Sequence, residues 1–304
     1  MFATRGLASS AMSCARSISH VTIIGGGLMG SGITQVAAQT GHKVTLVDLD
    51  QNILDQSTAR ISKSLARVAK KKFGDDAEGA KSFVESTMGA ISTATDACSV
   101  VKDTDLVIEA IVENMAVKHR LFKELDSVAP QDVIFTSNTS SLSISEIAEV
   151  TSRKDKFGGL HFFNPVPVMK LLEVVKTENI SAETLSALTA FGKKLGKVTI
   201  ECTDTPGFIV NRLLVPNIAE AVKMLERGVA SAPDIDTAMK LGAGHPMGPL
   251  QLADYVGLDT CLFILEGWSQ KYPDVEIFQV PEMLKRLVAE GKLGNKSGEG
   301  FYKH

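Results

Sequence analysis

The feature that most restricts the fold of this chain is a turn of glycines between an apolar run and a helix-forming segment. Residues 20–24 are mostly β-branched and predict a buried strand, and residues 25–30 then read Gly-Gly-Gly-Leu-Met-Gly. Small and apolar residues over 31–40 predict a helix that ends at Gly41, and residues 43–47 predict a second strand. We therefore expect a β-α-β unit, in which the two strands lie parallel in one sheet.

The glycine turn also has the spacing of a dinucleotide site. It fits G-x-G-x-x-G, and Asp48 ends the second predicted strand 21 residues after Gly27. Such glycines let a pyrophosphate approach the backbone, and the aspartate hydrogen-bonds the adenosine ribose. Because a carboxylate repels the 2′-phosphate of NADP, the pattern predicts NAD, although a glycine-rich turn capped by an aspartate is the alternative. The predicted contacts are Gly25, Gly27, Leu28, Met29, Gly30 and Asp48.

The alternation of strands and helices continues over most of the chain. Strands are predicted at 105–109 and 133–136, and helices at 53–73, 78–88 and 118–128. This order predicts an α/β, Rossmann-type, doubly wound and mostly parallel sheet with helices on both faces. Two further strand-like runs, 157–163 and 170–175, precede a last predicted strand at 197–202.

Beyond residue 204 the chain predicts only helices. Thr205 can cap a helix whose first residue is Pro206, Ser231 and Asp234 fit a capping box, and residues 281–290 predict another helix. We therefore expect a segment outside the fold at 1–18, a Rossmann domain at 19–204 and an all-helical C-terminal domain at 205–304.

Composition excludes some classes of function and sets the first residues apart. The formal net charge of -3 provides no basic footprint for nucleic acid, and no apolar run reaches the roughly 18 residues of a membrane span. The four cysteines show no spacing typical of metal ligands.

The chain has no acidic residue before Asp48, and its start is rich in serine and arginine. This predicts a mitochondrial transit segment at 1–18, with a tail that carries no address as the alternative.

An NAD enzyme that oxidises an alcohol needs a group that removes the hydroxyl proton, and histidine commonly serves because it ordinarily titrates near neutrality. Of the six histidines, His161 lies in the otherwise apolar run 159–163. If that run and residues 170–175 pair as a hairpin centred on Pro167, His161 faces Glu173. A carboxylate beside an imidazole fixes its tautomer and stabilises its protonated form. The spacing therefore predicts a catalytic pair, with a structural histidine as the alternative.

Six motifs follow one another in order along the chain. They are residues 25–30, Glu109-Ala-Ile-Val-Glu113, Ser137-Asn-Thr-Ser-Ser141, His161-Phe-Phe-Asn-Pro165, Asp204-Thr-Pro-Gly-Phe-Ile-Val-Asn-Arg212 and Gly298-Glu-Gly-Phe-Tyr302. In this combination the chain closely resembles the mitochondrial short-chain L-3-hydroxyacyl-CoA dehydrogenase family. The resemblance implies NAD-dependent oxidation of (S)-3-hydroxyacyl-CoA to 3-oxoacyl-CoA in fatty-acid β-oxidation. It also implies a mitochondrial matrix location and a homodimer held by the C-terminal domain.

The resemblance also suggests roles for single residues. It makes His161 the base, oriented by Glu173, and places Ser140 and Asn211 beside the reacting oxygen of the substrate. The further predicted NAD contacts are Glu113, Lys118, Ser140, Asn164 and Lys296, and the predicted CoA contacts are Ser64, Lys71 and Ser140.

The CoA assignment agrees with the charge of the predicted helix. Ser64 and Lys71 are seven residues apart, on one face of that helix, and Arg60 and Arg67 lie near this face. Such a face can attract the phosphates of CoA. Without the resemblance, a solvated basic helix would be the preferred interpretation.

Two other functions stay open at this point. A related NAD-dependent hydroxy-acid or sugar-acid dehydrogenase would share the two-domain plan, but it would not need the basic helix around Lys71. A non-catalytic structural protein on the same fold is disfavoured by the presence of His161, Glu173, Ser140 and Asn211.

Overall fold

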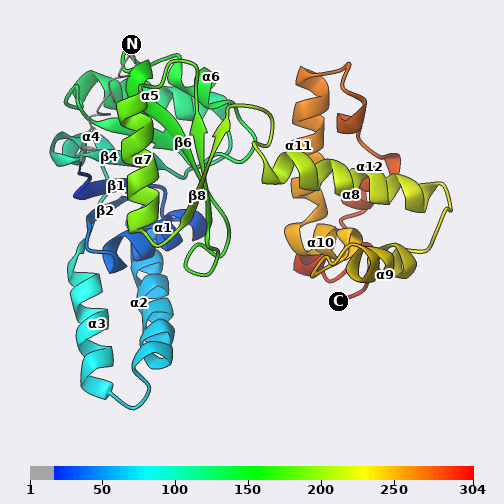
Figure 1. Ribbon diagram of the computed structural model, residues 1–304, viewed down its shortest axis with the longest axis horizontal. Helices are drawn as coiled ribbons and strands as arrows, with labels where there is room; N and C mark the ends of the chain where they lie inside the picture. Colours follow the sequence, from blue (N-terminus) through cyan, green and yellow to red (C-terminus); the bar gives the residue numbers. More distant parts are fainter. Residues whose placement is uncertain (1–16) are drawn as a thin grey trace, which may run out of the picture. The chain divides into compact units, whose positions relative to one another are not determined.

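The chain forms two compact units, Met1–Thr205 and Pro206–His304, and each is described by itself (Figure 1). The computed structural model describes residues 17–304, so nearly all of the predicted transit segment lies outside the described residues. None of the described helices combines the length and the hydrophobicity that crossing a bilayer requires.

The first unit is built on one eight-stranded sheet with the order β3-β2-β1-β4-β5-β6-β7-β8. Every neighbouring pair is parallel except β6 and β7, which are antiparallel. The chain steps outward from β1 to one side and returns to place β4 on the other, which confirms the predicted doubly wound sheet. The strands are β1 (His20–Ile24), β2 (Lys43–Val47), β3 (Ile91–Ala94), β4 (Leu106–Glu109), β5 (Ile134–Ser137), β6 (Phe157–Phe162), β7 (Leu171–Lys176) and β8 (Val198–Thr203).

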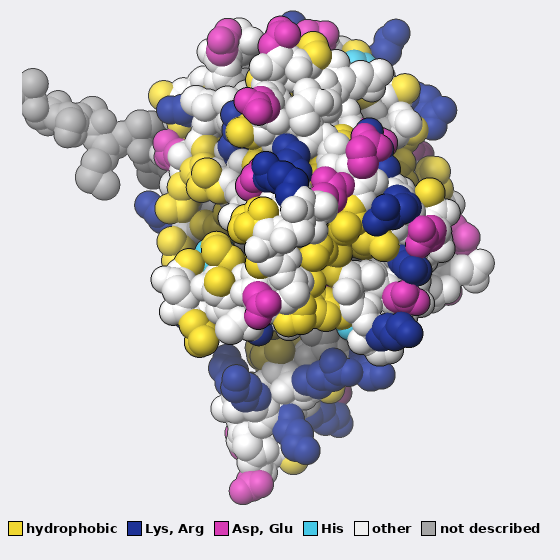
Figure 2. All heavy atoms as spheres, turned by 90° about the vertical axis from the view of Figure 1, so that its right-hand side faces the viewer, with side chains coloured by type: hydrophobic (Ala, Val, Ile, Leu, Met, Phe, Trp, Pro, Cys, Tyr) yellow, Lys and Arg dark blue, Asp and Glu magenta, His cyan; other side chains and the backbone are white. Residues whose placement is uncertain are grey.

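Helices connect the parallel strands of this sheet, and two of them extend away from it. Figure 1 shows α2 and α3 leaving the sheet as an antiparallel pair, and Figure 2 shows Lys and Arg side chains gathered on this projection. One side of α2 is buried through Leu54, Ile61 and Leu65, so the cations lie on its other faces. The helices of this unit are α1 (Leu28–Gln39), α2 (Gln51–Phe73), α3 (Ala77–Gly89), α4 (Ala97–Val100), α5 (Met115–Val128), α6 (Ile144–Ala148) and α7 (Ala182–Lys194).

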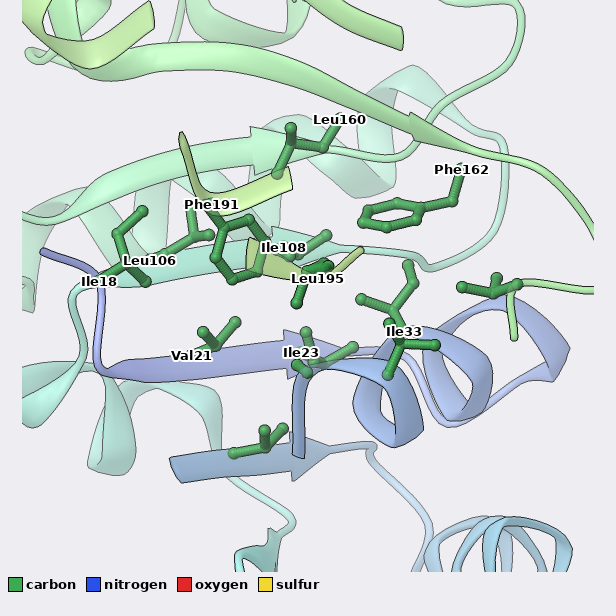
Figure 3. Packing of buried hydrophobic residues seen from close by; sticks show 14 of the residues in the cluster. Ile18, Val21, Ile23, Ile33, Leu106, Ile108, Leu160, Phe162, Phe191 and Leu195 are labelled. Carbon is green, nitrogen blue, oxygen red and sulfur yellow. The ribbon is translucent and has the colours of Figure 1, made fainter. Parts of the chain in front are cut away.

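The main core lies on one face of the sheet. Figure 3 shows Val21 and Ile23 of β1 beside Leu106 and Ile108 of β4, with Ile33 of α1 packed over them. All five side chains are completely buried. Burial of each such side chain contributes about 1.5–3 kcal/mol of transfer free energy, so this layer holds the ends of the strands in fixed positions.

Strand β3 and the helices α4, α6 and α7 of the first unit were not predicted, and α1 begins earlier than expected. Strand β3 is short and half-exposed at the edge of the sheet, so it carries no clear apolar pattern. Helix α7 lies between the predicted strands at 170–175 and 197–202, where no helix was predicted. Helix α1 begins at Leu28 instead of residue 31 because Gly27, in an extended conformation, is already its N-cap.

The second unit is entirely helical apart from short bridges. Its core contains Leu250, Leu258, Leu265, Trp268 and Phe278. Ser231 is the N-cap of α9, as predicted, since its Oγ accepts a hydrogen bond from Asp234 N. The second half of the predicted capping box differs, because Asp234 Oδ2 accepts from the Ser231 hydroxyl at 2.5 Å. The helices are α8 (Val210–Glu226), α9 (Ala232–Gly242), α10 (Pro249–Val256), α11 (Leu258–Lys271) and α12 (Glu282–Ala289).

The predicted helix start at Thr205 and Pro206 is wrong. Helix α8 begins only at Val210, because Gly207 and Phe208 both take positive φ angles, 76° and 53°, which a right-handed helix does not contain. A Cβ on Gly207 would also collide with the ring of Trp268. Packing within the unit, rather than the local capping signal, therefore decides where the helix starts.

Candidate active site

The glycine turn lies where β1 ends and α1 begins, and it is closed by the end of β2. Gly25 N donates to Val47 O at 2.8 Å, and Gly26 N donates to Asp48 Oδ2 at 2.7 Å. Gly25 has a φ of 110°, and a Cβ there would meet the Ala110 carbonyl at 2.5 Å. A Cβ on Gly30 would overlap the carbonyl of Gly25. The turn can therefore take this close-packed form only with glycine at both positions.

A cavity of about 560 Å³ opens beside this turn. Gly25, Gly27 and Asp48 lie in its wall, together with apolar side chains that include Ile24, Val47, Ile53, Ile111 and Leu121. The first N–H groups of α1 begin at the same turn and have no partner within the helix. A largely apolar cavity, the Asp48 carboxylate at the end of β2 and a helix N-terminus fit the adenine, ribose and pyrophosphate of a dinucleotide.

A histidine–glutamate pair lies on the antiparallel hairpin of β6 and β7. The register places His161 directly opposite Glu173, as the hairpin centred on Pro167 predicted. His161 Nδ1 and Glu173 Oε2 are 2.7 Å apart, and the two residues are only 3% and 1% exposed. Because Glu173 accepts from Nδ1–H, it leaves the lone pair on Nε2. That Nε2 lies 3.0 Å from Ser140 Oγ, which can donate to it.

The loop that carries Ser140 is held by a carboxylate. Glu113 Oε1 accepts hydrogen bonds from Thr139 Oγ1, Ser140 N, and both the N and Oγ of Ser141, at 2.5 to 3.2 Å. Burial by itself would raise the pKa of Glu113, but the Lys118 ammonium and these hydrogen bonds lower it below its ordinary value. Glu113 is therefore ionised, and its hydrogen bonds hold the loop next to His161 in place.

Burial and two nearby carboxylates shift the pKa of the Cys202 thiol in β8. Burial, and next the negative charges of Glu173 and Asp204, raise the pKa of Cys202 to about 12. A thiol with this pKa stays protonated at neutral pH and is a poor nucleophile. His161 is therefore the candidate base among these groups, and Cys202 is a poor candidate for a nucleophile.

Comparisons with known proteins agree with this geometry. Residues 20–205 match the family "3-hydroxyacyl-CoA dehydrogenase, NAD binding domain", and residues 207–304 match "3-hydroxyacyl-CoA dehydrogenase, C-terminal domain". The chain belongs to the 3-hydroxyacyl-CoA dehydrogenase family. It is an NAD-dependent oxidoreductase of this family, and its first unit is the NAD-binding domain.

Full-length relatives are found in animals and bacteria. The chain is 58% identical to the mitochondrial hydroxyacyl-coenzyme A dehydrogenase of Sus scrofa, over 99% of this chain and 97% of the relative. It is 58% identical to the enzyme of the same name from Homo sapiens, over 94% and 91% of the two chains. The crystal structure of (S)-3-hydroxybutyryl-CoA dehydrogenase from Ralstonia eutropha is 41% identical, with a TM-score of 0.89 over 95% of this chain and 99% of that one.

Several residues predicted at the dehydrogenase site come together in the first unit. Glu113, Ser140, His161 and Glu173 form one hydrogen-bonded chain. Lys118 joins this chain through its ion pair with Glu113 at 3.3 Å. Its side chain is only 1% exposed, so in this structure its surroundings are almost entirely protein.

The predicted CoA residue Ser64 lies near two predicted NAD residues. Ser64, Leu28 and Asn164 line a small cavity of about 140 Å³ together with Arg60 and Pro165. Lys71 lies two turns further along α2, on the exposed part of the helix.

Two predicted site residues belong to the second unit. Asn211 is the second residue of α8, and it is half-buried. Lys296 lies in the short turn Asn295–Ser297, where its Nζ pairs with Asp259 at 2.5 Å. This ion pair was not predicted.

Other contributors to the site were missed in the sequence. Arg60 Nη1 donates to Ser31 Oγ at 2.9 Å and reaches the carbonyl of Gly27 at 3.3 Å, so it supports the glycine turn from α2. Glu109 at the end of β4 is completely buried and pairs with Lys118 at 2.6 Å. The available signal was an acidic residue ending an otherwise apolar strand, since such a charge needs a partner when it is buried.

Proposed function

We propose that this dehydrogenase oxidises (S)-3-hydroxyacyl-CoA to 3-oxoacyl-CoA, with His161 as the general base. The observation that carries the proposal is the arrangement around His161. Glu173 accepts a hydrogen bond from Nδ1–H at 2.7 Å, so the lone pair that can take a proton lies on Nε2, which is 3.0 Å from Ser140 Oγ.

The reaction assigns separate tasks to these side chains. His161 Nε2 takes the proton of the 3-hydroxyl group, and Glu173 stabilises the imidazolium that results. Ser140 and Asn211 hydrogen-bond the reacting oxygen. NAD, when bound, supplies the hydride acceptor.

The cofactor contacts are proposed from both units. Gly25, Gly27, Leu28, Met29 and Gly30 bind the pyrophosphate, which the helix N-terminus attracts, and Asp48 binds the adenosine ribose. Glu113, Lys118, Ser140, Asn164 and Lys296 complete the proposed contacts. The cavity beside Asp48 supports this assignment.

The CoA part of the substrate is proposed to bind along α2. Ser64 and Lys71 are the proposed contacts, with Ser140 nearer the reacting end. The cations gathered on the α2 and α3 projection support a site for phosphate groups (Figure 2). A free hydroxy acid carries one carboxylate and no phosphates, so it would gain less from these charges.

Assembly as a homodimer through the second unit is also proposed. Several large apolar side chains of this unit are exposed, and Figure 2 shows hydrophobic side chains gathered on the face toward the viewer. The exposed apolar side chains of the second unit include Leu213 at 70%, Leu241 at 83% and Phe263 at 55% exposure. Exposed apolar groups in such number are typical of a surface that another chain covers.

We propose the mitochondrial matrix as the location, with residues 1–18 as a transit segment. The acid-poor, Ser- and Arg-containing composition of that segment supports the proposal. The relatives from Sus scrofa and Homo sapiens are mitochondrial by name. The proposal is tested by expressing the full chain with a C-terminal fluorescent tag, with and without residues 1–18. Equal mitochondrial import of both forms would contradict it.

The proposed chemistry is tested with the variant His161→Ala. We expect NAD binding, measured by calorimetry, to stay unchanged, while kcat for NADH oxidation with acetoacetyl-CoA falls by at least about 10²-fold. Free acetoacetate is the matched control substrate for the wild-type protein, and it should be turned over far more slowly. Near-normal activity of His161→Ala would remove the assignment of the base. Equal rates with the free acid would point to a hydroxy-acid dehydrogenase.

A further inference from the structure

The carboxylate of Glu109 lies behind the proposed active site and takes no part in the proposed chemistry. Its side chain is completely buried at the carboxyl end of β4. Oε1 accepts hydrogen bonds from Lys118 Nζ at 2.6 Å and from Ile111 N at 2.7 Å, and Oε2 accepts one from Ser137 Oγ at 2.6 Å. One side chain thus connects the ends of β4 and β5 with the first turn of α5.

Lys118 is shared between two carboxylates. Its Nζ lies 2.6 Å from Glu109 and 3.3 Å from Glu113, and its side chain is 1% exposed. A buried ammonium keeps its position only while it is paired, because its desolvation is costly. Removal of the charge of Glu109 would leave Glu113 as the one carboxylate paired with Lys118, and the side chains of Lys118 and Glu113 would then move from their present positions. Glu113 is the same carboxylate that holds the loop 139–141.

The same loop is held from its other side by Ser137. Ser137 Oγ donates to Glu109 and accepts a hydrogen bond from Thr139 N at 3.2 Å. Glu109 therefore reaches the loop by two routes, one through Lys118 and Glu113 and one through Ser137. The first route ends at Ser140, whose N–H donates to Glu113 at 3.1 Å and whose Oγ lies 3.0 Å from His161 Nε2, and the second ends at Thr139, the residue before it.

We propose that Glu109 is a positioning residue for the dehydrogenase reaction, which sets Ser140 against His161 through Lys118 and Ser137. The inference rests on the proposed roles of His161 and Ser140. The charge of Glu109 therefore matters for turnover, although its hydrogen bonds go to Ile111, Lys118 and Ser137 and not to the base or its orienting carboxylate.

A second buried ion pair at the far end of α5 provides a matched control. Asp126 Oδ1 accepts from Arg153 Nε at 2.6 Å, and the Arg153 side chain is 1% exposed. The remaining bonds of Arg153 go to backbone carbonyls of Asp126, Ala129, Pro130 and Val133, which lie before β5. This pair resembles that of Glu109 and Lys118 in charge and in its buried cation, but its carboxylate is 13% exposed and it binds a different loop.

The test compares Glu109→Gln with Asp126→Asn in the full-length enzyme. The amide keeps the size of each side chain and one acceptor oxygen, but it replaces the other oxygen with an N–H donor and removes the charge. For Glu109→Gln we expect kcat with acetoacetyl-CoA and NADH to fall on the order of 10- to 100-fold, with KM for acetoacetyl-CoA within about twofold of wild type. For Asp126→Asn we expect unchanged kcat. An unchanged kcat in folded Glu109→Gln, or an equal loss in both variants, overturns the proposal.

A double-mutant cycle with Ser140→Ala identifies the route. If Glu109 acts through Ser140, adding Glu109→Gln to Ser140→Ala lowers kcat by less than about twofold, because the shared path is already broken. A loss as large as in the single variant overturns the proposal.

Two further measurements keep the outcome clear. Should Glu109→Gln fail to fold, as seen by circular dichroism, Ser137→Ala replaces it, and kcat of this variant should fall several-fold; an unchanged kcat overturns the proposal. The activity of His161→Ala, measured in parallel, distinguishes a failure of the role of Glu109 from a failure of the proposed base. If His161→Ala is inactive and Glu109→Gln is normal, only the role of Glu109 fails, whereas an active His161→Ala removes the proposed base itself.

Discussion

Single side chains in this active site work as buried groups that are hydrogen-bonded to one another. His161 and Glu173 are both nearly inaccessible to water, and a carboxylate in such surroundings interacts more strongly with a neighbouring imidazole than it would at the surface. The strand register brings them together without any loop, so the pair is rigid. A rigid carboxylate next to Nδ1 can stabilise the imidazolium as soon as it forms, and this stabilisation is the contribution expected of Glu173.

The substitution Glu173→Gln tests this contribution. The amide oxygen can still accept from Nδ1–H, so the tautomer is kept, but the negative charge that stabilises the imidazolium is lost. We expect kcat to fall on the order of 10²-fold, with little change in the urea midpoint of unfolding. Glu201→Gln, on the exposed side of the adjacent strand β8, is the control and should behave as wild type. If Glu173→Gln is unfolded, a structural role is indicated instead.

Elements are joined at this site by capping interactions that reach across the sheet. Asp204, directly after β8, accepts hydrogen bonds from Ile144 N at 3.0 Å, Ser145 N at 2.8 Å and Ser143 Oγ at 2.7 Å. It therefore caps α6, a helix of only five residues, from a strand on the other side of β6 and β7. A short helix has little stability of its own, so this cap fixes the segment that follows the loop of Ser140.

The substitution Asp204→Ala should weaken this connection. Loss of a capping carboxylate leaves the first N–H groups of α6 without their acceptor, and we expect the free energy of unfolding to fall by about 1–2 kcal/mol. Urea denaturation followed by circular dichroism measures the change. Asp155→Ala, which removes a surface carboxylate 3.9 Å from Lys156, should stay within about 0.5 kcal/mol of wild type. Equal stability of the two variants would show that the cap contributes nothing.

The whole molecule presents apolar side chains that neither unit buries. Leu213, Leu241 and Phe263 of the second unit are each more than half exposed, at 70%, 83% and 55%. Covering such side chains with a second copy would remove apolar area from water at about 25 cal/mol per Å², which is the main driving force for stable association. The proposed homodimer therefore depends on the second unit, whereas the proposed base belongs to the first.

The substitution Leu241→Glu tests the proposed assembly. A charge on the covered surface would have to be desolvated without a partner, so we expect the protein to shift from dimer to monomer at micromolar concentration. Size-exclusion chromatography with light scattering measures the mass. Val168→Glu, at a side chain 71% exposed on the first unit, should leave the mass unchanged. A wild-type protein that is already monomeric would contradict the proposal.

Local patterns in the sequence were sufficient for the β-α-β unit around residues 25–30, for Asp48 at the end of β2, and for the pairing of His161 with Glu173. Each of these depends on residues that are close in the chain or on the two-residue period of a hairpin, so spacing alone predicts them. The network of Glu109, Lys118 and Ser137 depends instead on β4 and β5 being neighbours and on α5 packing at their ends. The start of α8 likewise follows from the packing of Gly207 against Trp268. Contacts between elements are set by the fold as a whole, because the free energy that brings two distant segments together is spread over the entire core, and only the tertiary structure shows which buried charges meet.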